Sequence, residues 1–205
     1  MAYARSLSGV DPQRIVLWGY SAGCVNVLKL AASESDGIAA VLAVAPFVDG
    51  LRRALATPPR LTAWIVPRAL ADAAGRHTTI PVTAPLGEHG VMTFAGESDG
   101  FAAAVAPGSP WRNEISPAVL LVMPAIRPVR YGRRITAPLW VGLGERDLTV
   151  AREAVERLAE RAPRGDLARY DWDHFGALTD DGPARVATDQ IAFLARQGLG
   201  QVPSQ

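Results

Sequence analysis

A serine stands between two glycines where the chain changes from one structural pattern to another. The segment RIVLWGYSAGCVNVLKL, residues 14–30, opens with an unbroken run of residues that favour β-strands. Beyond the serine, apolar residues recur at the spacing of one helical face: Cys24, Val25, Leu28 and Ala32. Ser21 is therefore predicted to lie at a strand-to-helix junction.

The motif around this serine, G-x-S-x-G, fits a nucleophilic serine. A hydroxyl is a poor nucleophile at its ordinary pKa, so it must be exposed to substrate, close to a base and near donors that stabilise an oxyanion. Gly19 and Gly23 are expected to allow a tight turn where a Cβ would collide, which projects Ser21 above the sheet at the positive end of the following helix. The backbone N–H of Ala22 is then an oxyanion donor. The alternative is a serine that only caps the helix.

The rest of the chain alternates strands and helices on either side of a long insertion. An apolar run at 38–47 predicts a second strand, buried on both faces as in a parallel sheet. Strands are also predicted within 138–147 and 167–175, each followed by a helix, and the last helix is expected to turn Ala187, Ile191 and Leu194 inward. We predict an α/β fold: a mostly parallel sheet with flanking helices, formed by 1–49 and 135–199. Residues 50–134 are predicted to form an inserted, partly helical cap, and 200–205 a frayed tail.

Three histidines are candidates for the base that activates the serine: His77, His89 and His174. In this arrangement the nucleophile comes first in the chain, then the acid and then the histidine, with acid and histidine on loops after successive strands. Asp147 and His174 each end a predicted strand, so both are expected at the carboxyl edge of the sheet where Ser21 emerges. His174 would take the proton from Ser21, and Asp147 would hold the imidazole.

Other assignments stay open from these residues alone. Asp147 is alternatively a cap of the helix that begins near Val150, and His174 is alternatively a surface histidine. Three further carboxylates close to these strand ends are alternative acids: Glu145, Asp171 and Asp173. His77 and His89 fall in the cap, where solvent-facing or locally bonded loop histidines are expected.

Composition excludes several other classes of protein. The 205 residues include 21 Lys and Arg against 20 Asp and Glu, and this net charge of +1 indicates neither nucleic acid nor an anionic membrane as partner. The single cysteine, Cys24, cannot form an intrachain disulfide. The first residues lack the apolar core of a signal peptide, and no run approaches the roughly 18 apolar residues of a membrane span. We therefore expect a cytoplasmic protein.

GYSAG, together with Asp147 and His174, resembles the α/β-hydrolase superfamily. The segments VDPQRIVLWGYSAG, APFVDG, PGSPWRNE and DHFG are similar to its bacterial branch related to dienelactone hydrolases and S15-type peptidases, and the resemblance runs over nearly the whole chain. It implies a sheet packed between helices and a cap inserted before the strand that carries the acid. It also implies hydrolysis of an ester, amide or similar acyl bond in a small molecule or peptide, without a metal or cofactor. Dienelactone hydrolases proper use a cysteine nucleophile, so Ser21 argues against that substrate.

The resemblance also implies that the chain begins just before the fifth of the family's eight strands. Four earlier strand and helix units, roughly a hundred residues, are absent at about thirty residues per unit. The loop after the third strand, which gives the family's other oxyanion donor, is absent with them. The strand RIVLW is then expected at an edge of the sheet, with unpaired backbone groups that normally must be covered. We expect a start codon assigned too late; the alternatives are a degraded gene fragment and an edge covered by another chain, as in a homodimer.

Apolar residues of the cap are candidates for lining a pocket over Ser21: Trp64, Ile65, Phe94, Phe101, Trp111 and Met123. Ordinary packing of the cap on the sheet is the favoured alternative for most of them. Four arginines precede the strand at Pro138: Arg127, Arg130, Arg133 and Arg134. A solvated linker surface is expected there in preference to a carboxylate-binding site.

Two hypotheses about function follow. The first is a serine hydrolase that forms an acyl-enzyme on Ser21. The second is a truncated, catalytically impaired homologue that associates through its exposed strand edge. The sequence distinguishes neither esterase from peptidase nor one acyl group from another.

Overall fold

Four parallel strands form one sheet in the order β1-β2-β3-β4. The computed structural model describes residues 1–34 and 36–200, so most of the tail predicted at 200–205 lies outside them. The strands are β1 (Ile15–Tyr20), β2 (Ile38–Val44), β3 (Leu139–Gly144) and β4 (Gly165–Tyr170). The helices of the core are α1 (Ala2–Ser6), α2 (Cys24–Ser33), α7 (Arg152–Arg161) and α8 (Gly182–Arg196), with 3-10 turns η1 (Ser21–Gly23) and η4 (Pro128–Arg134). The predicted α/β fold is confirmed.

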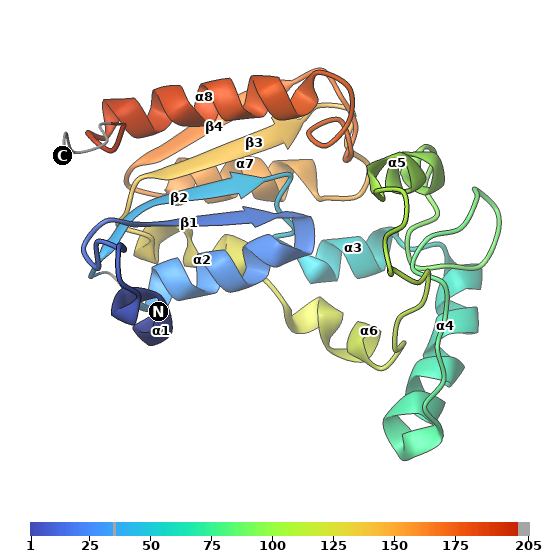
Figure 1. Cartoon of the computed structure of the whole chain (residues 1–205). Coiled ribbons are helices and arrows are strands. Elements are labelled where there is room, and N and C mark those ends of the chain that lie inside the picture. Colours follow the sequence, from blue (N-terminus) through green and yellow to red (C-terminus); the bar gives the residue numbers. More distant parts are fainter. Residues whose placement is uncertain (35, 201–205) are drawn as a thin grey trace.

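Helices cover both faces of this sheet because strand residues alternate between two apolar clusters (Figure 1). Val41, Ala43 and Val141 face α2, α7 and η4, where Leu28 and Leu158 are fully buried. Leu42, Val44 and Trp140 face α8 on the other side. Burial on both faces explains the continuous apolar runs in the sequence of β2 and β3.

The buried face of α8 differs from the one predicted. Val186, Gln190 and Phe193 are buried against the sheet, whereas Ile191 is 65% exposed and Ala187 is also exposed. The prediction holds for Leu194, which is half-buried and packs against the same cluster. The two stripes are offset by one residue and both have helical spacing. Phe193 decides between them, because burying its large ring against Trp140 and Tyr170 removes more apolar surface from water than burying Ile191 would.

β1 lies at one end of the described sheet and pairs there with β2 alone. Val16 and Tyr20 pack against the cluster under α8, while Trp18 on the same side of the strand is 52% exposed. The strand therefore presents an indole and the backbone groups of its outer side to the surroundings.

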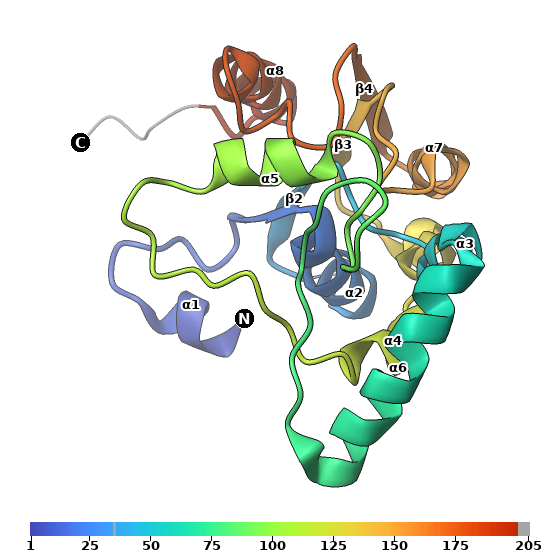
Figure 2. The ribbon, with the colours of Figure 1, turned by 90° about the vertical axis from the view of Figure 1, so that its right-hand side faces the viewer.

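The segment between β2 and β3 leaves the sheet and returns to it (Figure 2). Its helices are α3 (Gly50–Ala56), α4 (Pro59–Ala71), α5 (Glu97–Ala104) and α6 (Val119–Val122), with a π-helical turn η2 (Asp72–Arg76) and a 3-10 turn η3 (Met123–Ala125). Leu61, Ile65, Ala69 and Ile80 form a small apolar cluster of their own. Figure 2 shows α4 extending away from the sheet and α5 lying close to the strand ends. Within the described residues, no helix is long and apolar enough to cross a membrane.

A buried ion pair joins the two ends of this segment. Asp49, 2% exposed, caps α3 and also accepts hydrogen bonds from Arg127 Nε at 3.1 Å and Nη2 at 3.0 Å. Arg127 therefore binds a carboxylate of the chain itself, whereas Arg130, Arg133 and Arg134 are exposed as expected of a linker surface. Burial raises the pKa of Asp49, but the hydrogen bonds from Arg127 and the Arg52 N–H outweigh burial and hold it below its ordinary range.

We predict that Asp49→Ala lowers the free energy of unfolding by about 2–3 kcal/mol, because it removes a helix cap and leaves Arg127 without its partner. Asp166→Ala, which breaks an exposed pair with Arg196, should cost under about 0.5 kcal/mol. Urea titration of both variants at pH 7 measures the difference. Equal costs would show that burial gives the Asp49 pair no particular weight.

The same pair predicts a pH dependence. Because the folded pKa of Asp49 is below its unfolded value, its contribution to stability is present above that unfolded value, about 3.9. The contribution is lost as the pH falls through the lower folded pKa. The difference between wild type and Asp49→Ala should therefore narrow on acidification below about pH 4, and a constant difference from pH 7 to pH 2 would contradict this.

Candidate active site

The serine turn is built by close packing between β1 and α2. A Cβ at Gly19 would lie 3.0 Å from Val27 Cγ2 and 3.1 Å from the Cys24 backbone, so no larger residue fits there without displacement. Ser21 has φ +50°, a left-handed conformation that costs free energy in a non-glycine residue. Its carbonyl accepts the Phe47 N–H at 3.1 Å, which ties the turn to the end of β2.

Gly23 does not have the role predicted from the sequence. Its φ is −59° and ψ is −28°, ordinary helical values, and a Cβ there would meet no heavy atom within 4 Å. Gly23 and Ala22 are both exposed in the first turn after Ser21. The steric requirement for glycine therefore applies to Gly19 alone of the pair.

The three residues proposed from the sequence lie together at the carboxyl edge of the sheet. Ser21 Oγ is 2.8 Å from His174 Nε2, and His174 Nδ1 is 2.7 Å from Asp147 Oδ2. An ionised carboxylate only accepts hydrogen bonds, so the proton on the imidazole belongs on Nδ1 and Nε2 is free to accept from the serine hydroxyl. The side chains of His174 and Asp147 are 3% and 0% exposed, whereas Ser21 is half-buried.

Asp147 is held by the loop that follows β3. Its Oδ1 accepts the Thr149 N–H at 2.7 Å and the Val150 N–H at 3.2 Å, while Oδ2 faces His174. The helix α7 begins later, at Arg152, with Ala151 as its N-cap residue, so the carboxylate caps a turn and contacts the imidazole at once.

The alternative acids are engaged elsewhere. Glu145 pairs with Arg152 and Arg169, and Asp171 pairs with Arg146. Asp173 Oδ1 accepts the backbone N–H groups of Phe175 and Gly176. Among these four acidic side chains, Asp147 is the one within hydrogen-bond distance of His174.

Tyr20, directly before the serine, also contacts the histidine. Its hydroxyl donates to the His174 carbonyl at 2.6 Å and its ring centroid is 5.4 Å from the imidazole. Burial, together with the nearby charges of Asp147 and Asp173, raises the pKa of Tyr20, so the phenol stays protonated as the donor.

The other two histidines lie away from this site. His77 is exposed after η2, with φ +49°, and His89 is exposed and stacks on Trp64 at 4.7 Å between ring centroids. Both agree with the loop positions expected for them. Across the described residues, no group of three or more His, Cys, Asp and Glu side chains is arranged to hold a metal ion.

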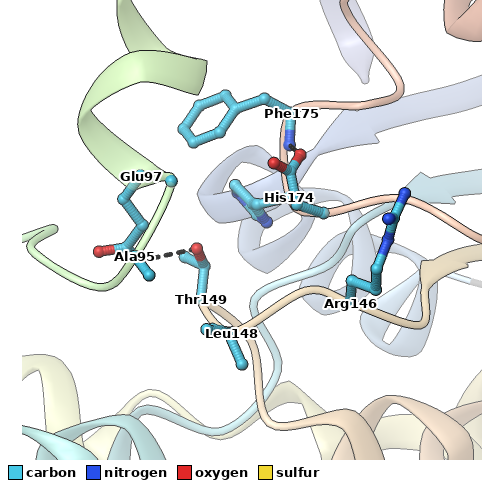
Figure 3. Close-up of a pocket in the computed structure, with 9 residues that line it drawn as sticks. Ala95, Glu97, Arg146, Leu148, Thr149, His174 and Phe175 are labelled. Atoms are coloured by element: carbon cyan, nitrogen blue, oxygen red, sulfur yellow. Dashed lines mark hydrogen bonds between the residues drawn. The ribbon is translucent and has the colours of Figure 1, made fainter.

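The apolar cap residues are divided among several places. Ile65 is buried in the cap's own cluster, with Trp64 against it. Phe101 and Trp111 line a cavity of about 400 Å³ beside α5, and the Phe101 ring is 5.7 Å from Phe175, next to His174. Met123 lines a separate cavity of about 220 Å³ between α3, α4 and α6. A narrow pocket at His174 is lined by Glu97, Leu148 and Thr149 among others (Figure 3).

The sequence profile of the prolyl oligopeptidase family matches residues 1–105, just over half of the 205 residues, including the serine turn. The chain belongs to the prolyl oligopeptidase family. This confirms the α/β-hydrolase superfamily inferred from the motifs, although the motifs alone suggested the branch of dienelactone hydrolases and S15-type peptidases.

One curated relative and two solved structures illustrate what this family member is similar to. Over 201 residues it is 32% identical to the quorum-quenching protein AidA of Acinetobacter baumannii strain MDR-ZJ06, covering 96% of this chain and 66% of that protein. The α/β hydrolase GrgF from Penicillium sp. sh18 has a TM-score of 0.75 at 21% identity, covering 96% of this chain and 68% of that one. DcsB, in complex with its substrate analogue, has a TM-score of 0.72 at 18% identity, with 96% and 69% covered. The two structures share the fold, and the chain spans slightly under two thirds of the curated relative.

Gly19 and Gly23, the two glycines that flank Ser21 in this member of the prolyl oligopeptidase family, allow a matched test of the turn. Gly19→Ala should lower the free energy of unfolding by about 1–3 kcal/mol, because its Cβ meets Val27 and the Cys24 backbone at 3.0–3.1 Å. Gly23→Ala should be neutral or stabilising by up to about 1 kcal/mol, since alanine favours helical φ and ψ. Denaturant titrations compare the two, and equal destabilisation would refute this account of the turn.

Cys24 should be unreactive in the folded chain. The thiol is fully buried and lies 3.7 Å from the Val44 carbonyl oxygen, and burial raises its pKa to about 12. The thiolate, which is the reactive form, is therefore scarce at pH 8. After treatment with iodoacetamide, intact mass should show no adduct on the native chain and one adduct on the chain denatured in guanidinium. Rapid alkylation of the native chain would contradict this.

Proposed function

We propose that this chain is a serine hydrolase that cleaves an ester, amide or related acyl bond through Ser21, His174 and Asp147. The observation that carries the proposal is the continuous hydrogen-bonded line from Ser21 Oγ through the imidazole to Asp147 Oδ2, with distances of 2.8 and 2.7 Å. Membership of the prolyl oligopeptidase family supports hydrolysis as the reaction class.

In the proposed reaction, Ser21 Oγ attacks the acyl carbon while His174 Nε2 takes the hydroxyl proton. The tetrahedral intermediate collapses to an acyl-enzyme as His174 returns the proton to the leaving group. A water then repeats the sequence and releases the acid. Asp147 stabilises the imidazolium in each half-reaction, and the backbone N–H of Ala22, in the first turn after the serine, is the proposed oxyanion donor.

One relative and one cavity bear on the class of substrate. One relative is a quorum-quenching protein, which is a reason to include quorum-sensing signal molecules among the acyl compounds tested. The aromatic cavity at Phe101 and Trp111 lies next to Phe175 and would suit an apolar part of a substrate.

The alternative function is association through β1 without turnover. It is favoured by the single pairing of β1 in the described sheet and by the 52% exposure of Trp18. A chain of this kind would form dimers or bind another protein at that edge and would not react at Ser21.

A fluorophosphonate separates the two proposals. Ser21 Oγ should form a bond to phosphorus with loss of fluoride, and intact mass should show one adduct on the wild-type chain. Ser21→Ala should show none, and His174→Ala should slow labelling by at least about 10³-fold. His89→Ala, an exposed histidine away from the site, is the matched control and should label at the wild-type rate.

The contrary results are equally distinct. An adduct that persists in Ser21→Ala would place reactivity elsewhere. No adduct on a folded wild-type chain that sediments as a dimer, with Trp18→Arg restoring the monomer, would support association in place of hydrolysis.

A further inference from the structure

The cap contributes a buried carboxylate that the proposed chemistry does not use. Glu97, the first residue of α5, is 3% exposed. Its Oε2 accepts the Phe94 N–H at 2.7 Å, and its Oε1 accepts the Thr149 hydroxyl at 2.7 Å (Figure 3). Removing a carboxylate from water costs several kcal/mol unless hydrogen bonds and an opposite charge compensate it, so its place against the Asp147 loop is a costly feature of the fold.

Thr149 contacts both buried acids of this region. Its hydroxyl donates to Glu97, while its backbone N–H donates to Asp147 Oδ1 at 2.7 Å. Glu97 of the cap thus holds the Thr149 side chain, and Asp147 holds the Thr149 backbone. Because Oδ1 is fixed in this way, Oδ2 is left directed at His174 Nδ1.

Arg53 supplies the positive charge behind Glu97. It is 8% exposed, and its Nη2 is 3.6 Å from Glu97 Oε1. Its guanidinium also donates to the Val91 carbonyl at 3.1 Å and lies 4.1 Å from the centroid of the Phe94 ring. Burial lowers the pKa of Arg53, and the negative charges of Glu97 and Asp147 act against that decrease. Arg53 therefore forms a buried ion pair with Glu97.

We propose that Glu97 and Thr149 are positioning residues for the reaction at Ser21. Glu97, neutralised by Arg53, fixes the Thr149 side chain, and Thr149 in turn fixes Asp147 in the orientation that holds His174. The inference rests on the proposed function, since positioning has a catalytic effect only if Ser21 reacts. It also makes the cap part of the active site, because Glu97 and Arg53 both come from the segment between β2 and β3.

Two substitutions at Thr149 isolate the hydroxyl. Thr149→Val keeps the shape and the backbone N–H but removes the bond to Glu97, whereas Thr149→Ser keeps the bond. We expect Thr149→Val to slow fluorophosphonate labelling of Ser21 by about tenfold or more, because small displacements of reacting groups have large effects on rate. Thr149→Ser should stay within about twofold of wild type. With an ester substrate, the decrease should fall on kcat and leave KM unchanged.

A measurement independent of activity tests the positioning itself. The His174 Nδ1 proton, shared with a buried carboxylate, should give a downfield proton resonance in the wild type and in Thr149→Ser. Faster exchange with water should weaken or remove it in Thr149→Val. Thr188→Val, on the exposed face of α8 and bonded to its own helix, is the matched control and should change neither readout.

The outcomes separate the inference from the proposed function. A wild-type chain that shows the resonance but never reacts with the fluorophosphonate would overturn hydrolysis. The positioning role would then be decided by whether Thr149→Val weakens the resonance. Wild-type labelling rate and resonance in a folded Thr149→Val variant would overturn the positioning role alone. If melting curves show Thr149→Val unfolded, Thr149→Ala decides, because it also removes the hydroxyl and keeps the backbone N–H to Asp147. Slower labelling and a weaker resonance support the proposal, and wild-type values of both refute it.

Discussion

The parallel pairing of the four strands is the constraint on which the candidate site depends. Parallel strands bring their carboxyl ends to one edge, so residues far apart in the chain meet without further folding devices. Ser21 and His174 are 153 positions apart in the chain, and yet Ser21 Oγ lies 2.8 Å from His174 Nε2, because each residue follows a strand of the same sheet. The cap can leave and return between β2 and β3 without disturbing this, since the register of that pair is held by apolar side chains on both faces.

Two buried carboxylates, Asp147 and Glu97, lie in the interior near Ser21. Asp147 and Glu97 are both nearly inaccessible to water, and each is satisfied by a different set of donors: backbone N–H groups and the imidazole for one, and a hydroxyl, a backbone N–H and Arg53 for the other. A buried charge left without partners would be far more costly than a lost surface pair. The loop after β3 and the start of α5 are therefore held together by charge as well as by apolar contact.

Much of this arrangement could be predicted from the sequence, and the reasons are local. Apolar runs identify strands buried on both faces, and a glycine-flanked serine between a strand and a helix identifies the turn. The order of Asp147 and His174 along the chain then predicts their meeting at one edge, and the structure brings them together. These signals depend on a few neighbouring residues and on the topology of a parallel sheet.

What could not be predicted depends on contacts between distant segments. Two of the three α8 residues predicted to face the sheet, Ala187 and Ile191, are exposed, because only the packing of Phe193 on the sheet distinguishes two equally periodic faces. Gly23 occupies the second glycine position of the motif, but the space around it would accept a Cβ. Glu97 lies 52 positions from Thr149 in a cap of weak periodicity, so no local pattern marks it as buried. A threonine two residues after an aspartate indicates a turn, but not that its hydroxyl reaches another acid.

The hydrogen bond from Tyr20 to the His174 carbonyl has a consequence for thermal motion. Tyr20 directly precedes Ser21 in the chain, so this hydrogen bond joins the end of β1 to the backbone of His174, the base in the proposed reaction. We therefore expect motions of β1 and of the loop after β4 to be coupled. Such coupling would limit changes in the distance between Ser21 Oγ and His174 Nε2.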